Sequence, residues 1–382
     1  MDGFIPLSVP NIKGNEQKYV DDALAKEWVS TGGAYITRME ETIAEYLGTP
    51  QAVACQSGTA ALHLSLICSG VTPGDEVVVP TLTFVAAVNP VKYAGAKPVF
   101  MDCDDTLCMD MDKLERFFEE ECVLSGGTFS NRRTGRRVSA VIVVHVFGNV
   151  ADMDRLMDLR ERFGFAVIED ATEALGSRIT KGRYAGRFAG TIGDMGAYSF
   201  NGNKLITTGG GGMLVSSVRP ERLGRAKYLS TQAKDDPVYF VHNEIGYNYR
   251  MTNVQAAIGV GQLERLEEFI GVKRENYRRY IENGIPLLPF REDTRPNYWF
   301  YSYLTERRDE LIAYLEQNRI QSRPVWRLIH TLRPYEDCRS YRIEKARVYA
   351  DRIVNLPCST NLQGKDVTRV ARTIEQFGRI GR

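Results

Sequence analysis

Lys204 is the residue of this chain that is best placed for covalent chemistry. It follows a mostly apolar segment at 197–200 and precedes a glycine run at 209–212, after which a second apolar segment begins. A lysine on a loop that returns into a sheet is partly desolvated, and its amine can then form a Schiff base with a carbonyl group. The alternative is an ordinary surface loop that holds a solvated lysine.

A carboxylate stands at the end of another apolar segment. Val167 and Ile168 are followed by Glu169, Asp170 and, three positions later, Glu173. Because open α/β sheets bind ligands beyond the carboxyl ends of their strands, we expect Asp170 to face a bound molecule. An acidic residue at a strand end can also serve only as a helix cap, and this interpretation stays open.

Small polar residues introduce a predicted helix at 56–63 (Gln-Ser-Gly-Thr-Ala-Ala-Leu-His). The backbone N–H groups at the start of a helix have no partner within the helix and can bind an anion. Taken alone, the segment favours simple N-capping by Ser57 or Thr59 over an anion site.

Together these three segments supply what pyridoxal 5'-phosphate (PLP) requires. The helix start offers N–H groups to its phosphate, Asp170 keeps its pyridine nitrogen protonated, and Lys204 supplies an amine to its aldehyde. Asp170 precedes Lys204 by 34 positions. We therefore predict PLP as the cofactor.

Short apolar segments between residues 50 and 220 must position these groups. They alternate with helical patterns, which predicts an α/β fold with a mostly parallel sheet that helices cover on both faces. The segments are 76–79, 98–101, 138–146, 166–168, 197–200 and 213–215. Residues 125–137, rich in Gly, Ser and Arg, are expected to form a solvated loop.

An amphipathic pattern from Ala256 to Ile270 predicts one helix that links two domains. The boundary near residue 250 gives a large cofactor-binding domain at 1–250, and a linking helix with a small C-terminal domain at 251–382. Within the second part, residues 308–318 and 364–377 are expected to form helices.

The balanced charge of the chain argues against nucleic acid and anionic lipid as partners and favours small molecules. The 382 residues include 49 Lys and Arg against 48 Asp and Glu, so no strong field attracts nucleic acid or anionic lipid. No segment approaches the length of a membrane span, and the first residues do not resemble an export signal, which predicts a cytoplasmic protein. The seven cysteines form no Cys-x-x-Cys pair, and we expect reduced thiols and no metal site.

The ordered motifs resemble the DegT/DnrJ/StrS sugar aminotransferases over nearly the whole chain. The similarity runs through residues 28–33, 193–204, 246–251 and 355–357. It implies the PLP-dependent transferase fold type I, which is aspartate aminotransferase-like, with a mostly parallel central sheet and a smaller C-terminal α+β domain.

The resemblance also implies roles for single residues. Lys204 would hold PLP covalently and act as the acid and base, and Asp170 would pair with the ring nitrogen. Glu173 would lie near the ring hydroxyl, where many relatives carry an amide or imidazole. The other implied cofactor contacts are Ser57, the amides of Gly58 and Thr59, Phe84 on the ring face, the Ser199 hydroxyl and, from a neighbouring subunit, Asn248.

The motifs at 170–173, 199–204, 232–236 and 323–326 resemble the LegC-like branch of the family, which serves legionaminic acid and bacillosamine-type pathways. This implies transfer of an amino group from L-glutamate, by way of pyridoxamine 5'-phosphate, to carbon 4 of a UDP- or GDP-linked 2-acetamido-4-keto-2,6-dideoxyhexose in a homodimer with shared sites. Thr31 and Gly32 are expected at the substrate. For Trp326 and His330, substrate contact and simple packing are both open.

Three functions other than sugar amino transfer fit the residues of this chain less well. A PLP-fold sugar dehydratase would carry His at the position of Lys204, and a non-catalytic regulatory protein of the same fold would not need Asp170, Ser199 and Lys204 together. A nicotinamide oxidoreductase needs a Gly-x-Gly-x-x-Gly turn after its first strand, and the glycine run at 209–212 has another context. The nucleotide and the sugar stereochemistry are left open.

Overall fold

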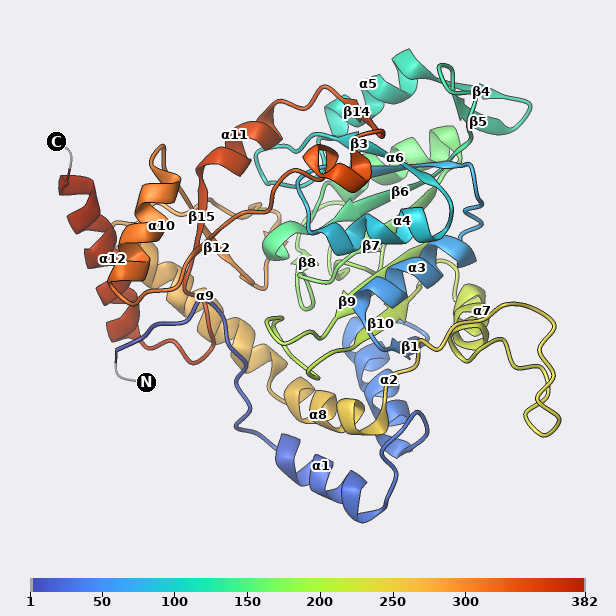
Figure 1. Ribbon diagram of the computed structural model, residues 1–382, viewed down its shortest axis with the longest axis horizontal. Helices are drawn as coiled ribbons and strands as arrows, with labels where there is room; N and C mark the ends of the chain where they lie inside the picture. Colours follow the sequence, from blue (N-terminus) through green and yellow to red (C-terminus); the bar gives the residue numbers. More distant parts are fainter. Residues whose placement is uncertain (1–2, 381–382) are drawn as a thin grey trace.

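An eight-stranded sheet forms the centre of the computed structural model, which describes residues 3–380 (Figure 1). Its strand order is β1-β10-β9-β7-β6-β2-β3-β14, and β10 alone runs against its neighbours. The strands are β1 (Ala52–Cys55), β2 (Glu76–Pro80), β3 (Lys97–Met101), β6 (Val138–Val144), β7 (Ala166–Asp170), β9 (Met195–Ser199), β10 (Gly212–Val215) and β14 (Arg339–Tyr341). All six predicted strand segments are confirmed, as is the mostly parallel sheet.

Alternating side chains of the central strands are buried on both faces. Ile142 and Ile168 pack into one hydrophobic cluster, whereas Val141 and Val167 pack into the other. Successive side chains of a strand point to opposite faces, so a strand that is apolar throughout needs a cover on both sides. Side chains of α3 and α4 contribute to the first cluster, and those of α2, α5 and α6 to the second.

Twelve α-helices lie within residues 3–380. They are α1 (Glu16–Ala25), α2 (Ala34–Leu47), α3 (Gly58–Cys68), α4 (Asn89–Tyr93), α5 (Met111–Glu121), α6 (Met153–Phe163), α7 (Glu221–Ser230), α8 (Asn253–Leu263), α9 (Leu266–Glu282), α10 (Arg308–Gln317), α11 (Lys345–Arg352) and α12 (Gly364–Arg379). The predicted helices at 308–318 and 364–377 are confirmed by α10 and α12. None of the helices in this range is long and apolar enough to cross a membrane.

The predicted single linking helix is wrong, because the chain breaks between α8 and α9. Arg265 leaves the helical conformation, with φ −116° and ψ 8°. Its guanidinium binds Glu268 in the first turn of α9, at 2.6 and 2.8 Å. Acidic side chains are favourable at a helix start, so Glu267 and Glu268 support a new helix at this point.

The predicted solvated loop at 125–137 is also wrong in its first half. β4 (Cys122–Ser125) and β5 (Thr128–Asn131) form a hairpin there. Gly126 and Gly127 have φ values of 57° and 77°, which suit a two-residue turn between twisted strands. The buried side chain of Phe129 anchors the hairpin to the core.

A smaller antiparallel sheet is built from the later part of the chain. It has the order β12-β15-β13, from β12 (Tyr301–Leu304), β15 (Ile353–Leu356) and β13 (Arg323–Pro324), and β8 (Arg178–Ile179) pairs separately with β11 (Thr294–Arg295). β14, however, joins the large sheet beside β3. The division into domains near residue 250 stays a prediction.

Glu169 in β7 is a fully buried carboxylate. It accepts hydrogen bonds from the N–H groups of Gly190, Ile192 and Gly193 at 2.5–2.7 Å and lies 2.8 Å from His145 Nε2. The other ring nitrogen of His145 accepts from Ala151 N, so Nε2 carries the proton and donates to Glu169. Burial opposes ionisation, but these donors together hold the pKa of Glu169 below its usual range.

We expect Glu169→Gln to lower the free energy of unfolding by about 2–4 kcal/mol, because an amide NH₂ would face N–H donors where a carboxylate oxygen now accepts. The measurement is urea unfolding followed by circular dichroism. Glu316→Gln, at an exposed position of α10, is the control and should leave the midpoint unchanged. Equal midpoints for both variants would contradict this account of Glu169.

Candidate active site

A cavity of about 570 Å³ lies at the carboxyl ends of β6, β7 and β9. Val144, Asp170 and Ser199, the last residues of these strands, all line it. The structure brings nine of the sequence-predicted residues together on its wall. They are Ser57, Gly58, Thr59, Phe84, Asp170, Glu173, Ser199, Lys204 and Trp326.

The start of α3 forms one end of the cavity. The Ser57 hydroxyl accepts from Ala60 N at 3.1 Å and so caps the helix. The N–H groups of Gly58 and Thr59, in the first turn, donate to no acceptor among residues 3–380. A Cβ at Gly58 would lie 2.8 Å from Ser199 Cβ, so glycine lets β9 approach the helix start. Two N–H groups and the Ser199 hydroxyl therefore converge on a site suited to an anion.

Asp170 is buried at the end of β7, on the same face of the sheet as Ile168. Thr172 N donates to its Oδ1 at 3.0 Å. No cationic side chain within residues 3–380 makes an ion pair with it. Burial raises the pKa of Asp170, and the hydrogen bond from Thr172 and the charge of Lys204 oppose this effect. A carboxylate in this setting is suited to a cationic group on a ligand.

Lys204 follows β9 on a short loop, and its side chain is 12% exposed. Its Nζ lies 3.7 Å from Glu173 Oε1 and 4.3 Å from the centre of the Trp299 ring. Glu173 Oε2 accepts from Phe147 N at 2.9 Å. Burial raises the pKa of Glu173 to about 7, although the charge of Lys204 lowers it. The lysine amine is thus held between a carboxylate and an aromatic face.

Four predicted site residues lie elsewhere in this chain. Thr31 and Gly32 line a separate cavity of about 130 Å³, together with Arg250. His330 packs in the protein, with Nδ1 2.6 Å from Thr81 Oγ1. Asn248 is exposed and pairs through its backbone with Thr231. Thr31, Gly32 and Asn248 do not line the cavity that contains Lys204.

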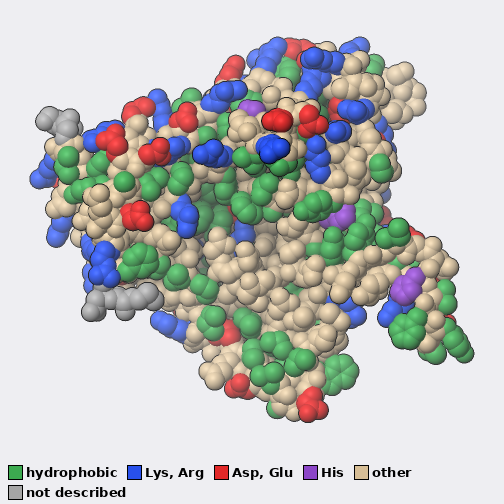
Figure 2. Space-filling view, in the orientation of Figure 1, with side chains coloured by type: hydrophobic (Ala, Val, Ile, Leu, Met, Phe, Trp, Pro, Cys, Tyr) green, Lys and Arg blue, Asp and Glu red, His purple; other side chains and the backbone are tan. Residues whose placement is uncertain are grey.

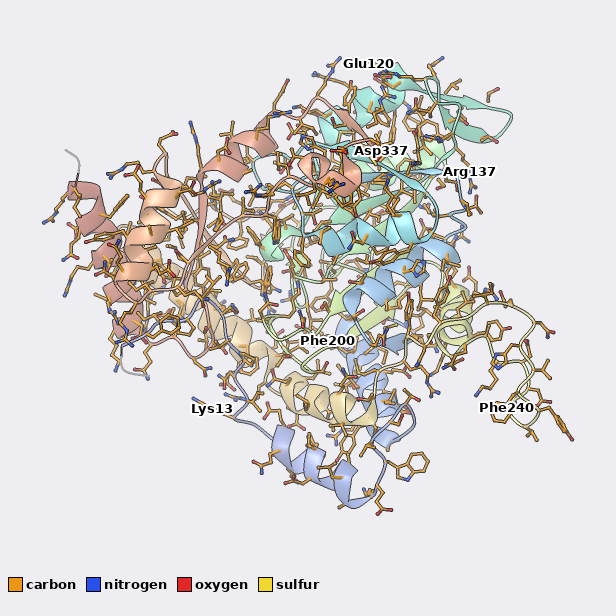
Figure 3. The ribbon with its side chains drawn as sticks, in the orientation of Figure 1. Lys13, Glu120, Arg137, Phe200, Phe240 and Asp337 are labelled. Atoms are coloured by element: carbon orange, nitrogen blue, oxygen red, sulfur yellow. The ribbon has the colours of Figure 1, made fainter. Side chains whose placement is uncertain are left out.

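Asn248 follows a projecting loop between α7 and α8. The loop extends away from the body of the molecule, and apolar side chains cover its end (Figures 1 and 2). Phe240 points outward from its tip (Figure 3). Tyr239 is 80% exposed and Ile245 is 85% exposed. The apolar tip of this loop contrasts with the polar surface expected of a loop in a monomer.

Sequence reasoning missed several residues of the cavity wall. Trp299 stands in an aromatic run that is typical of a buried strand, so no signal separated it from core residues. Arg323 belongs to a recognised motif but was given no role at the site. The other missed residues include Ser8, Thr172, Asn201, Asn203, Gln321 and Asn355.

The cavity fits PLP on three independent counts. The N–H groups of Gly58 and Thr59, at the start of α3, suit a phosphate, and the buried Asp170 carboxylate suits a protonated pyridine nitrogen. Lys204 reaches the same wall with its amine. Within residues 3–380, no cluster of three His, Cys, Asp or Glu side chains is arranged to hold a metal ion.

The sequence of this chain matches a known family of enzymes. Residues 10–375 match the model of the DegT/DnrJ/EryC1/StrS aminotransferase family. The GDP-perosamine synthase of Escherichia coli O157:H7 is 35% identical over 98% of each chain.

Two solved structures have the same fold. The PLP form of Spr1654 from Streptococcus pneumoniae is 25% identical with a TM-score of 0.87, over 98% of this chain and 99% of that one. DesI, solved in the presence of its TDP-sugar product, is 26% identical with a TM-score of 0.87, over 100% of this chain and 95% of the other. The expected fold type I is confirmed. This chain therefore belongs to the DegT/DnrJ/EryC1/StrS aminotransferase family.

Proposed function

We propose that this chain is a PLP-dependent aminotransferase that moves the amino group of L-glutamate to carbon 4 of a nucleotide-linked 4-keto-6-deoxy sugar. The observation that carries the proposal is the cavity wall on which three groups converge: helix N–H groups that donate to no acceptor among residues 3–380, a buried carboxylate without an ion pair in that range, and a lysine. Membership of an aminotransferase family supports amino transfer. Lys204 argues against a PLP-fold sugar dehydratase, which would carry His at this position. The presence of Asp170, Ser199 and Lys204 together argues against a non-catalytic regulatory protein.

Each group has a role that follows from its place in the cavity. The N–H groups of Gly58 and Thr59 and the Ser199 hydroxyl bind the phosphate. Asp170 keeps the ring nitrogen protonated, and PLP, when bound, supplies a ring that accepts the electron pair released at the substrate carbon. Lys204 Nζ anchors the cofactor and moves the proton. Phe84 and Trp326 on the cavity wall restrict where the ring and the sugar can lie.

Two classes of sugar acceptor are each supported by a different observation. Similarity to a GDP-perosamine synthase favours a GDP-linked keto sugar. The motifs at 170–173, 199–204, 232–236 and 323–326 resemble the LegC-like branch and favour a 2-acetamido sugar linked to UDP or GDP. We propose carbon 4 as the site of amination in both cases.

A homodimer in the cytoplasm is the proposed setting. The exposed apolar loop that precedes Asn248 supports association with a second copy. The places of Thr31, Gly32 and Asn248, away from Lys204 in one chain, are also explained if these residues complete the partner's site.

The function is tested by incubating the protein with PLP, L-glutamate and a panel of UDP-, GDP- and dTDP-linked 4-keto sugars, with and without a 2-acetamido group. We expect 2-oxoglutarate and an amino sugar from at least one member. Lys204→Ala should abolish both products, whereas Lys18→Ala, on the outer face of α1, should not. Turnover by Lys204→Ala, or no amino sugar from any acceptor, would contradict the proposal.

Asp170→Asn should slow the reaction of the bound cofactor with glutamate by at least about a hundredfold, which corresponds to a loss of about 3 kcal/mol of transition-state stabilisation. The amide keeps the shape of the carboxylate but removes the charge that favours a protonated ring nitrogen. The measurement is a single-turnover rate in protein whose cofactor content is determined separately.

The matched control is Asp104→Asn. Burial raises the pKa of Asp104 as it does that of Asp170, but Asp104 does not line the cavity. The control should react at the wild-type rate. A near-normal rate in fully loaded Asp170→Asn protein would assign the ring nitrogen to another residue.

Glu173→Gln should stabilise the cofactor-free protein at pH 8. The folded-state pKa of Glu173 is raised to about 7, above the ordinary carboxyl value of 4.5. The native state therefore retains a proton that the unfolded chain has lost, so the free energy of unfolding falls as pH rises from about 4.5 to 7. The amide has no such dependence. We expect a gain of about 1–3 kcal/mol at pH 8 and none near pH 4.5.

The measurement is urea unfolding of wild type and variant at several values of pH, with Glu316→Gln as the control. Parallel pH profiles for wild type and Glu173→Gln would show that Glu173 is already ionised in the folded protein near pH 5.

A further inference from the structure

We infer that Trp299 is a positioning residue for Lys204 in the proposed aminotransferase reaction. This inference rests on the proposed function, but its physical basis is a set of contacts in the protein itself. Trp299 is 3% exposed and lies on the cavity wall, between α9 and β12. It belongs to neither the large sheet nor the start of α3.

Trp299 contacts two successive residues of the loop that carries the lysine. Its indole Nε1 donates to the carbonyl of Asn203 at 2.9 Å. The centre of its ring lies 4.3 Å from Lys204 Nζ. One side chain thus fixes the backbone immediately before Lys204 and also presents an aromatic face to the amine. A cation is attracted to such a face.

The position of Trp299 is itself fixed by two buried polar side chains. Its N–H donates to Asn297 Oδ1 at 3.0 Å, and its carbonyl accepts from Lys273 Nζ at 2.9 Å. Both Asn297 and Lys273 are buried. These two hydrogen bonds restrain the backbone of Trp299. The contacts of Trp299 therefore restrict the conformation of the lysine loop, rather than the loop setting the position of Trp299.

The same segment holds the other neighbour of the lysine amine. Asn297 Nδ2 donates to the carbonyls of Glu173 and Leu175, each at 2.9 Å. Between Asn297 and Trp299, Tyr298 has a φ of 57°, in the left-handed region that costs a non-glycine residue energy. Residues 297–299 form a clamp, in which Asn297 holds the Glu173 segment and Trp299 holds the Lys204 loop.

This clamp sets the place from which Lys204 can move a proton. When the amine is not linked to the cofactor, it lies between Glu173 Oε1 at 3.7 Å and the Trp299 ring. A long flexible side chain has many rotamers, and contacts on two sides reduce their number. Errors of about 1 Å in the placement of a reacting group can cost about a hundredfold in rate. The clamp accordingly affects proton transfer more than substrate binding.

The test compares Trp299→Leu, which removes the ring and the donor, with Trp299→Phe, which keeps a ring and removes the donor. Tyr277→Leu is the control for lost aromatic packing, because the Tyr277 ring packs 5.2 Å from the ring of Tyr298, the chain neighbour of Trp299, but Tyr277 does not line the cavity. Unfolding midpoints of all three variants are recorded, so that a general loss of packing is recognised.

The first readout needs neither cofactor nor substrate. Cofactor-free protein is treated with trinitrobenzenesulfonate, and the modified lysines are identified by peptide mass spectrometry. We expect Lys204 in Trp299→Leu to react at least about threefold faster than in wild type, because the ring that covers one side of its amine and the hydrogen bond that holds its loop are both removed. Trp299→Phe should be intermediate, and Tyr277→Leu should match wild type. This readout stays valid if the chain proves to catalyse another reaction.

The second readout is the division between kcat and KM in the loaded enzyme. We expect kcat of Trp299→Leu to fall about tenfold or more, with the KM values for glutamate and sugar changed less than about twofold. An unchanged rate of Lys204 modification in both Trp299 variants would overturn the inference, as would equal losses of kcat in Tyr277→Leu. If Trp299→Leu does not fold, the same two measurements on Trp299→Phe test the inference: the rate of Lys204 modification, and the loss of kcat relative to Tyr277→Leu.

Discussion

Two adjacent buried carboxylates at the end of β7, Glu169 and Asp170, place the strongest physical constraint on this structure. Consecutive residues of a strand face opposite sides of the sheet, so each charge must be compensated separately. Glu169 is compensated entirely by the protein, through His145 and three backbone N–H groups. Asp170 is left with a hydrogen bond from Thr172 and no ion pair in the described chain.

The compensation of Glu169 also shapes the site on the other face. Its three backbone donors belong to residues 190–193, which lead directly into β9. β9 ends at Ser199, and the loop that follows carries Lys204. A buried carboxylate that does not line the cavity therefore helps to set the register of the strand that presents the Ser199 hydroxyl and leads into the Lys204 loop.

Much of this arrangement could be predicted from the sequence, because strands that are apolar throughout and the residues at their ends obey simple rules. Asp170 at the end of β7 is such a case. β14 could not be found in this way, since it pairs with the distant strand β3. The hairpin at 122–131 does have a local signal, the Gly126-Gly127 turn, which the Gly-, Ser- and Arg-rich composition of 125–137 obscured. Trp299 was hidden for a related reason, because an aromatic residue that packs and one that positions a lysine have the same sequence signature. Thr31, Gly32 and Asn248 lie outside the cavity of their own chain, which a list of motifs does not show.

The place of β14 has a consequence for synthesis on the ribosome. Residues 339–341 complete the large sheet beside β3, and Ile5 at the opposite end of the chain pairs with Ile320. Until these late residues emerge, the nascent chain presents β3 as an open edge and leaves Ile5 without its bridge partner. The native sheet can thus close only after nearly all of the polypeptide has been translated, and in that interval the exposed edge is a site for chaperone binding or for misassembly with neighbouring chains.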